Sequence, residues 1–373
     1  AFNTLTELPE GMRAPRWAEP GDDFSLAQDL EPEFIATSHD SRTAWVTLQE
    51  NNGLAVVDIR SATVTDLVGL GKKNHMEAGN GLDASNRDDA INIQPWPVLG
   101  TYMPDSIFSY RTRGKTYLVT ANEGDGREYL YEIGEDGNPN DCPPPAVEDD
   151  GDCIVYTDET RVKDVTLDPA IFTDAALQED ENLGRIKMLS TEGNLDGDEE
   201  YEQIHTFGAR SISIWRPDGT RVFDSGDTME QVTAAALTDM GCVNSGEDVE
   251  DCSDFNSTND ENQSFDNRSD DKGPEPEGVV VGKVKGRYYA FVGLERVGGI
   301  MVFDVTQPEN TRYVDYINNR DFSVEDVEEE DAGDLGPEGL VFIKADDSPT
   351  GVPLLVVGNE VSGSTTIYEV LSE

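Results

Sequence analysis

The sequence predicts an all-β fold of the β-propeller type, and one repeated strand pattern carries this prediction. Residues 31–59, 275–305 and 337–370 share the same order of features. Each runs from a proline and an acid through a strand, a turn, a second strand, an acid and a glycine-rich turn into a third strand. A weaker copy spans 103–126. A single meander cannot bury both of its faces, so the copies are expected to stack as propeller blades do.

The clearest copy shows why these segments are expected to be strands. It contains apolar, β-branched or aromatic runs at 279–284, 288–294 and 300–305. Lys285 and Gly286 separate the first two runs, and a pair of glycines precedes the third. Such runs separated by short glycine turns are typical of an antiparallel meander.

Taken in order, the chain is expected to consist of a connecting segment at 1–30 and one propeller domain at 31–373. About five blades are visible and seven are expected when complete, so strands are expected upstream of residue 1 or on a partner, including other copies of the chain. The expected parts are a blade at 31–70, a polar loop at 71–96, a blade at 97–135, a disulfide-bearing insert at 136–160, a blade from three strands at 184–226, a helix at 229–241, a second disulfide-bearing insert at 242–274, and blades at 275–305 and 337–370.

The charge of the chain excludes one class of function. Its 77 acidic and 27 basic residues give a net charge of −50. Nucleic-acid binding needs a basic face, so it is excluded as a function, and binding to anionic membranes is disfavoured. Self-repulsion of this size costs stability unless salt or bound cations screen it. A saline or calcium-rich medium, with marine or halophilic origin, fits this composition.

The four cysteines form two local pairs, Cys142 with Cys153 and Cys242 with Cys252. Both pairs lie in acidic inserts without neighbouring histidines or Cys-x-x-Cys spacing, which argues against zinc. Two short-loop disulfides are expected, although other connectivities remain open, and disulfides imply export. Neither a membrane-spanning run nor a signal peptide is present, so the numbering is expected to begin inside a longer precursor.

Acidic residues recur at two positions of each repeat, the start of the first strand and the end of the second. In an antiparallel hairpin, the start of the first strand and the end of the second lie at the same edge of the sheet. If the first strand of every blade lines a central channel, these acids meet at one mouth. The expected group, to which Asp125 is added from the adjoining loop, is Glu33 with Glu50, Asp105 with Glu123, Glu277 with Glu295, and Glu338 with Glu360.

Crowded carboxylates raise one another's pKa or require a counter-cation. Their oxygens suit a hard divalent cation, and calcium is expected here ahead of magnesium or manganese. The alternative is that these acids are solvated turn residues of a very acidic protein.

Two polar loops offer further candidates. The loop at 71–96 carries His75, Asp83, Arg87, Asp88 and Asp89, which are candidates to reach the same mouth. The alternating acids of 194–200 resemble part of a calcium loop but lack the twelve-residue EF-hand pattern, so a solvated turn is equally expected.

Six motifs in order carry a resemblance that covers 27–373. They are QENNGLAVVDI, TANEGDGREY, FGARSISIW, DNRSDDKGPEPEGV, FVGLERVGGIMVFDV and GNEVSGSTTIYEV. The chain resembles the bacterial choice-of-anchor I surface proteins, which are related to mesenchyme-specific cell-surface glycoproteins of calcifying animals. The resemblance implies a secreted or surface-anchored β-propeller in the extracellular space, on the cell surface or in the periplasm. Some members are regarded as atypical alkaline phosphatases, which implies a metal-dependent phosphoesterase.

Two hypotheses of function follow. In the first, cations held by carboxylates act with scarce basic groups to hydrolyse a small phosphate ester. The basic candidates are Arg127, Arg210, Arg268, Lys272 and Arg296, whose alternative role is to form salt bridges with the acids. In the second, a non-enzymatic, calcium-stabilised surface protein presents its loops to a matrix or surface partner. The sequence contains no Gly-x-Ser-x-Gly nucleophile motif.

Overall fold

The computed structural model describes residues 8–14, 29–131, 147–149, 152–324, 327 and 332–371. Antiparallel sheets dominate it, as the repeats predict. Within the described chain, no helix is sufficiently long and apolar to span a membrane.

Three four-stranded sheets and one three-stranded sheet form the main body, in which strands consecutive in the repeats are neighbours. The first comprises β1 (Pro32–Thr37), β2 (Thr43–Leu48), β3 (Gly53–Asp58) and β4 (Thr63–Gly69). The second comprises β7 (Ile107–Thr112), β8 (Lys115–Asn122), β17 (Ser211–Trp215) and β18 (Arg221–Asp224). The third comprises β19 (Pro276–Val284), β20 (Arg287–Leu294), β21 (Ile300–Asp304) and β22 (Arg312–Ile317). The last comprises β23 (Pro337–Ile343), β24 (Leu354–Asn359) and β25 (Ser364–Glu369).

Local sequence explains how these strands turn. At the β19–β20 hairpin, Lys285 and Gly286 both have positive φ, 45° and 88°, as a two-residue primed turn requires. Val284 therefore pairs with Arg287, and the alternation of the two strands stays in register.

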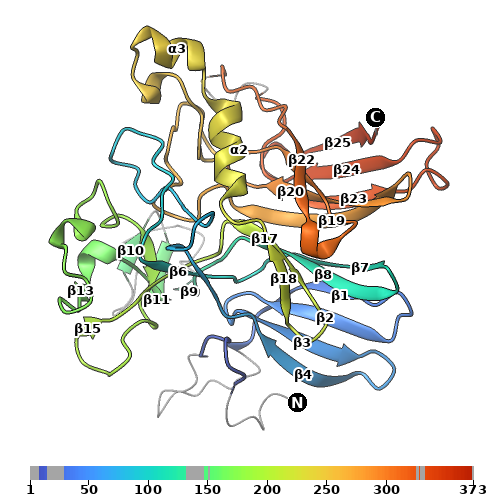
Figure 1. The fold of residues 1–373 in the computed structure, drawn as a ribbon, viewed down its shortest axis with the longest axis horizontal. Coiled ribbons are helices and arrows are strands. Elements are labelled where there is room, and N and C mark those ends of the chain that lie inside the picture. The colour runs from blue at the N-terminus through green and yellow to red at the C-terminus, as the bar shows by residue number, and fades with distance from the viewer. Residues whose placement is uncertain are drawn as a thin grey trace.

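The four sheets follow one another along one side of the molecule, from blue to red in Figure 1. The first strands are neighbours in space, because β1 lies beside β7, β7 beside β19, and β19 beside β23. The largest apolar core lies between the second and third sheets and includes Ile212, Ile214, Val292 and Phe303. The starts of all four sheets are thereby gathered into one region.

The separate blade predicted at 184–226 is not formed, because its three strands join different sheets. β14 (Lys187–Leu189) pairs with β12 (Glu159–Arg161), and β16 (Ile204–Thr206) runs parallel to β6 (Val98–Thr101). β17 instead pairs with β8 and completes the second sheet, so the strands of this sheet are separated by a long insertion. Hairpin reasoning assumed that neighbouring strands pair locally, and this assumption fails here.

Small elements make up the rest of the described structure, and most lie in this insertion. They are β5 (Lys72–Asn74), β9 (Glu128–Tyr131), β10 (Val147–Asp149), β11 (Asp152–Thr157), β13 (Thr166–Leu167), β15 (Glu200–Tyr201), η4 (Val162–Asp164), η5 (Ala175–Gln178), η6 (Val249–Asp251) and η7 (Pro308–Asn310).

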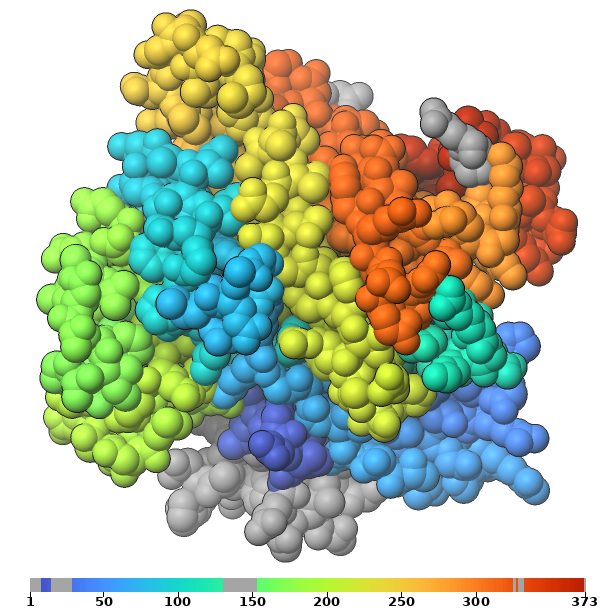
Figure 2. Space-filling view, viewed as in Figure 1, coloured from blue at the N-terminus to red at the C-terminus, as the bar shows by residue number. Residues whose placement is uncertain are grey.

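Two α-helices follow the second sheet: α2 (Thr228–Leu237) and α3 (Met240–Ser245). They occupy the predicted helical stretch, but Thr238 is extended and divides it. The expected disulfide joins Cys242 to Cys252, while Cys142 of the other expected pair lies outside the described residues. In Figure 2, α2 (yellow) lies on the surface beside the loop near residue 85 (cyan).

The short segment 8–14 does more than connect. Arg13 is 1% exposed, and its guanidinium forms a 2.5 Å ion pair with Asp158 and donates to the Glu50 carbonyl at 2.8 Å. The rest of the predicted connecting segment up to residue 28 lies outside the described residues.

Candidate functional site

The strand registers place the predicted acids at one edge of their sheets. Pro32 pairs with Leu48, Pro276 with Leu294, and Pro337 with Asn359. The acid that follows each proline therefore lies at the same sheet edge as the acid that ends the second strand. These registers confirm the predicted edge pairing for three of the four hairpins.

Three of these acids come within reach of a single ion. Glu123 directly follows β8, Glu277 lies at the start of β19, and Glu295 directly follows β20. One carboxylate oxygen from each lies within 4.8 Å of the other two. Glu123 and Glu295 are buried and Glu277 is half-buried. We call these three residues the glutamate cluster.

Close backbone approach fixes the position of Glu123. Gly208 has a φ of +69°, and a Cβ on it would lie 1.9 Å from the Glu123 carbonyl oxygen. The Glu123 side chain is held on both oxygens, by Gln49 Nε2 at 2.9 Å and Lys272 Nζ at 2.7 Å.

The carboxyls of the glutamate cluster are hard to ionise. Burial, together with the charges of Glu123 and Glu295, raises the pKa of Glu277 to about 11. Burial also raises the pKa of Glu123 to about 8, although Lys272 opposes this shift. The pKa of Glu295 rises through burial and through the charge of Glu275. Such shifts mark a site that takes up either protons or a cation.

Four more of the predicted acids belong to a wider acidic region, which reaches the glutamate cluster through Asp105. Burial raises the pKa of Asp105 to about 7, and the charges of Glu33 and Glu338 add to the effect, so these groups lie within electrostatic reach of Asp105. Burial likewise raises the pKa of Glu50 to about 8, with contributions from the charges of Glu31 and then Glu33. Glu33 and Glu338 themselves are exposed.

The remaining two predicted acids differ in their surroundings. Asp125 is exposed and lies 3.4 Å from Lys272 Nζ. Glu360 is exposed at the turn after β24, where its backbone N–H donates to Gly336. The structure thus brings three of the nine acids to ligand distance of one another, and Asp105 lies within electrostatic reach of them.

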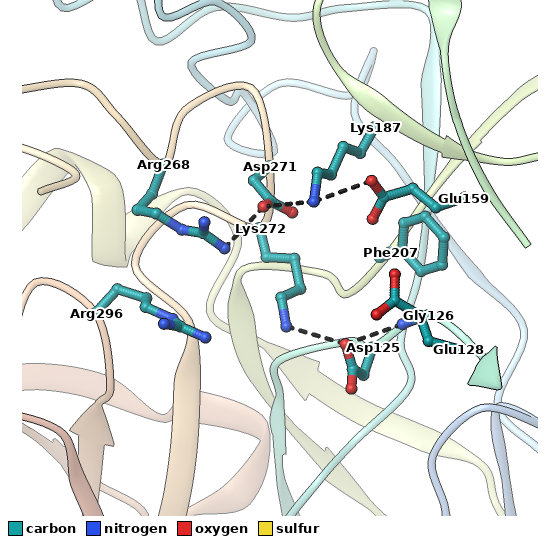
Figure 3. Close-up of a pocket in the computed structure, with 10 residues that line it drawn as sticks. All are labelled: Asp125, Gly126, Glu128, Glu159, Lys187, Phe207, Arg268, Asp271, Lys272 and Arg296. Carbon is teal, nitrogen blue, oxygen red and sulfur yellow. Dashed lines mark hydrogen bonds and ion pairs between the residues drawn. The ribbon is translucent and has the colours of Figure 1, made fainter. Parts of the chain in front are cut away.

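A polar pocket of about 230 Å³ adjoins the glutamate cluster. Figure 3 shows Arg268, Lys272 and Arg296 projecting toward it from one side, with Asp271 between Arg268 and Lys187 at its upper edge in this view. Its other lining residues are Asp125, Gly126, Glu128, Glu159 and Phe207. We call it the basic pocket, because four of the chain's few cationic side chains line it.

One buried carboxylate organises the cations of this pocket. Glu275 is fully buried and accepts contacts from Arg268 at 2.8 Å, Lys272 at 3.3 Å and Arg296 at 3.3 Å. Burial alone would raise its pKa, but the charges of Lys272 and Arg268 outweigh burial and lower it. Although burial opposes it, the charge of Glu123, followed by that of Glu275, raises the pKa of Lys272 well above its ordinary value.

The sequence prediction missed Glu275, because the hairpin rule selects the acid after Pro276 and not the one before it. It also missed the walls of the pocket, where Lys187 bridges Glu159 at 3.0 Å and Asp271 at 3.1 Å. The partners of Lys187 lie far apart in the chain, so no local pattern marks them.

Two of the predicted basic residues lie outside the basic pocket. Arg127 is 2% exposed and lies 3.6 Å from Asp29 and 3.8 Å from Asp158. Arg210 is 5% exposed; its guanidinium pairs with Glu230 and donates to the Asp83 carbonyl at 2.7 Å. Both side chains serve buried structural contacts, so the catalytic role predicted for them is not supported by their positions.

The candidates in the 71–96 loop do not reach the glutamate cluster as a group. His75 is buried with its Nδ1 2.7 Å from the Asn80 carbonyl, and Asp83 and Asp88 instead meet Asp266. The calcium-like stretch forms a separate, largely exposed acidic group of Asp196, Asp198 and Glu202.

Comparisons with known proteins identify the family. The choice-of-anchor I domain matches residues 2–308. The chain is 30% identical over 317 residues to a mesenchyme-specific cell surface glycoprotein of Strongylocentrotus purpuratus, covering 80% of this chain and 38% of that protein. It is 30% identical over 203 residues to Gigasin-3a of Magallana gigas, covering 52% of this chain and 67% of that protein.

Similarity to solved structures is weak. A putative 6-phosphogluconolactonase from Bacteroides uniformis matches with a TM-score of 0.28 and 12% identity, over 91% of this chain and 66% of that one. Because the structural similarity is this weak, the family assignment rests on the sequence comparisons alone. The domain match is sufficient for it, since it spans most of the chain. By that match, the chain belongs to the choice-of-anchor I family.

Proposed function

We propose that this chain is an extracellular or cell-surface β-propeller protein that binds a divalent cation at the glutamate cluster and a phosphate ester in the basic pocket beside it. The observation that carries the proposal is the contact between the two: Lys272 Nζ lies 2.7 Å from Glu123 of the cluster and also lines the pocket. A cation site and an anion site therefore share a wall.

The propeller arrangement is supported by the gathering of the first strands β1, β7, β19 and β23. Antiparallel four-stranded sheets whose first strands are neighbours are the building blocks of propellers. A surface location is supported by the cell-surface relative and by the disulfide between Cys242 and Cys252, since disulfides persist in oxidising compartments.

The glutamate cluster suits a hard cation such as calcium in ligand type and in charge. It offers carboxylate oxygens only, and burial makes their uncompensated ionisation costly. Lys272 already offsets part of the charge of Glu123, so an incoming cation would compete with this ammonium group. We therefore expect calcium affinity to be moderate and to depend on the position of Lys272.

The basic pocket supplies what phosphoryl transfer needs from side chains. The guanidinium groups of Arg268 and Arg296 present planar sets of donors that match phosphate oxygens, and Lys272 adds a point charge. A bound divalent cation would neutralise phosphoryl oxygens and activate water. In hydrolysis, water adds to phosphorus, the bond from phosphorus to the ester oxygen breaks, and the released alcohol takes a proton.

The test is hydrolysis of p-nitrophenyl phosphate by the whole chain, with calcium, magnesium or manganese and with chelator, alongside calorimetric binding of inorganic phosphate. We expect metal-dependent turnover, with Arg296→Ala reducing both turnover and phosphate affinity at least about tenfold, the value of one charge-assisted contact. Lys344→Ala is the matched control, because Lys344 pairs only with the exposed Asp347 among described residues. Absence of both turnover and phosphate binding would contradict the proposal.

A second candidate, a non-enzymatic surface protein stabilised by calcium, is favoured by one observation. Every cation of the basic pocket is already paired with a carboxylate, as Arg268 is with Asp271 at 2.8 Å. Calcium-dependent melting without turnover or phosphate binding would support this candidate over the enzyme.

A further inference from the structure

A second acidic group lies away from the glutamate cluster, where two loops meet beside α2. Asp83 and Asp88 come from the 71–96 loop and Asp266 from the second disulfide-bearing insert. One carboxylate oxygen from each lies within 4.8 Å of the others. Asp83 is 0% exposed and Asp266 is 3% exposed, while Asp88 is half-buried. We call these residues the aspartate cluster.

The aspartate cluster differs from the glutamate cluster because basic side chains do not compensate it. In the part of the chain that the structure describes, none of its three carboxylates forms an ion pair. Arg210 is the basic residue that approaches it, but its guanidinium donates to the backbone carbonyl of Asp83 and pairs with Glu230. The charge of Arg210 is thus neutralised by Glu230, which is itself 1% exposed, and not by the carboxylates of the aspartate cluster.

An unsatisfied oxygen points to a ligand at this place. Asp266 Oδ1 accepts a hydrogen bond from the Ser269 hydroxyl, but Asp266 Oδ2 is buried and has no hydrogen-bond partner among the described residues. Asn256, whose Nδ2 donates to the same hydroxyl at 2.8 Å, has an equally buried and unpartnered Oδ1. A buried carboxylate oxygen without a partner is costly, so native proteins supply a donor, a proton or a metal.

We propose that the aspartate cluster is a structural calcium site that joins the 71–96 loop to the 256–273 loop. The unpartnered Asp266 oxygen, the absence of any ion pair in the described cluster and the convergence of three carboxylates each lead to this assignment. The site is independent of the phosphoesterase proposal, since it requires neither the glutamate cluster nor turnover.

The ligand chemistry selects the class of cation. Three carboxylates bring a charge of −3 and only oxygen donors, which suits calcium, magnesium or manganese over zinc or copper. The ligands come from irregular loops and not from a rigid octahedral frame, and calcium tolerates such variable geometry at 6–8 oxygens. Backbone carbonyls or water would complete its coordination.

The cluster would also hold the basic pocket in shape. Asp266 begins the short segment that carries Arg268, Asp271 and Lys272, all of which line the pocket. Arg210 clamps the middle of this segment by donating to the carbonyls of Ser269 and Asp271, both at 2.7 Å. A cation at Asp266 would fix one end of a segment whose other end builds the pocket.

The experiment measures calcium binding to the whole chain after chelation, by calorimetric stoichiometry and by thermal melting. We expect Asp266→Asn and Asp88→Asn each to remove one binding event or weaken it at least about tenfold, and to reduce the calcium-induced rise in Tm. Asp198→Asn is the matched control from the exposed acidic group, and Glu277→Gln reports separately on the glutamate cluster. Neither is expected to remove this event.

Three results would overturn the assignment. The first is an unchanged calcium stoichiometry and affinity in Asp88→Asn. This variant tests the site even if Asp266→Asn fails to fold. The second is a rise in Tm for Asp266→Asn that is equal with calcium and with chelator, because that result identifies a shared proton in place of a metal. Loss of calcium binding in Glu277→Gln alone would likewise assign the ion to the glutamate cluster.

Discussion

Glu277→Gln is expected to change stability in opposite directions without and with calcium. The substitution keeps the shape of the side chain and removes one carboxylate from the glutamate cluster. In the cation-free protein, burial and the neighbouring charges raise the pKa of Glu277 from 4.5 to about 11. At pH 7 the native state therefore retains a proton that the unfolded chain releases.

The size of the effect follows from this difference. The native state holds the proton over about 2.5 pH units between the unfolded pKa and pH 7, and each unit corresponds to about 1.36 kcal/mol, which gives about 3 kcal/mol. Two charges at most 4.8 Å apart, at an effective dielectric constant of about 20, would repel by at least about 3.5 kcal/mol. Protonation of Glu277 avoids this repulsion, and its free-energy cost at pH 7 is of similar size.

In chelator, we expect Glu277→Gln to raise the free energy of unfolding by up to about 3 kcal/mol at pH 7. A raised carboxyl pKa costs stability only above the unfolded value, so the gain should shrink toward zero as the pH falls to about 4.5. In saturating calcium the order should reverse, since the wild-type chain is stabilised by binding and the variant loses a ligand.

Urea unfolding followed by tryptophan fluorescence, in chelator and in calcium and at both pH values, measures these differences. Glu360→Gln is the control, because Glu360 lies at the same edge of the last sheet, directly after its second strand, but is exposed. A variant less stable than wild type in chelator at pH 7, or an identical calcium response in both proteins, would refute the reasoning.

Three further predictions concern the scaffold around the site. Arg13→Ala leaves the buried carboxylate of Asp158 with only the more distant guanidinium of Arg127, at 3.8 Å, and should cost up to about 3–5 kcal/mol in urea unfolding, whereas a loss below about 1 kcal/mol would show that the Arg13–Asp158 pair is dispensable. Burial opposes ionisation of Glu192, but the His205 hydrogen bond and the charge of Lys72 lower its pKa to about 2. Glu192→Gln should therefore cost up to about 3 kcal/mol above pH 4.5, and the loss should vanish as the pH approaches 2; a loss independent of pH would contradict this. Gly208→Ala should lower the free energy of unfolding by more than about 1 kcal/mol, because the φ of Gly208 is positive and the added Cβ would meet the Glu123 carbonyl oxygen. The same substitution should weaken calcium binding at the glutamate cluster. A variant that melts and binds calcium like the wild type would show that Gly208 and Glu123 do not approach this closely.

Strand pairs could be predicted from the sequence where the two strands are joined by a short turn, but not where a long insertion separates them. Runs such as 279–284 and 288–294 pair across a two-residue turn, so their sequence pattern was sufficient to place β19 and β20. β17 pairs with β8 across the insertion between Asn122 and Ser211, and nothing in the sequence of either strand specifies the partner. The separate blade predicted at 184–226 was therefore wrong, although its individual strands exist.

The same distinction explains the site. Glu277 and Glu295 were predicted to share an edge from a single hairpin, and Glu123 joined them because β8 and β19 belong to neighbouring sheets. Asp266 could not be linked to Asp83 in this way, because both lie in irregular loops without a register. The metal roles of all these acids remain predictions until binding is measured.

The contrast between the two acidic clusters bears on how a chain of net charge −50 can fold. At Glu275 three cations converge on one buried carboxylate, so scarce positive charge is concentrated where the pocket forms. The aspartate cluster receives none of this charge among the described residues, yet Asp266 and Glu275 lie at the two ends of one short segment. If basic side chains were available for both ends, a cation would be unnecessary at either. Because they are not, the buried carboxylates around Asp266 must take up either a proton or, as we propose, an external cation, while Arg268 and Lys272 remain in the pocket.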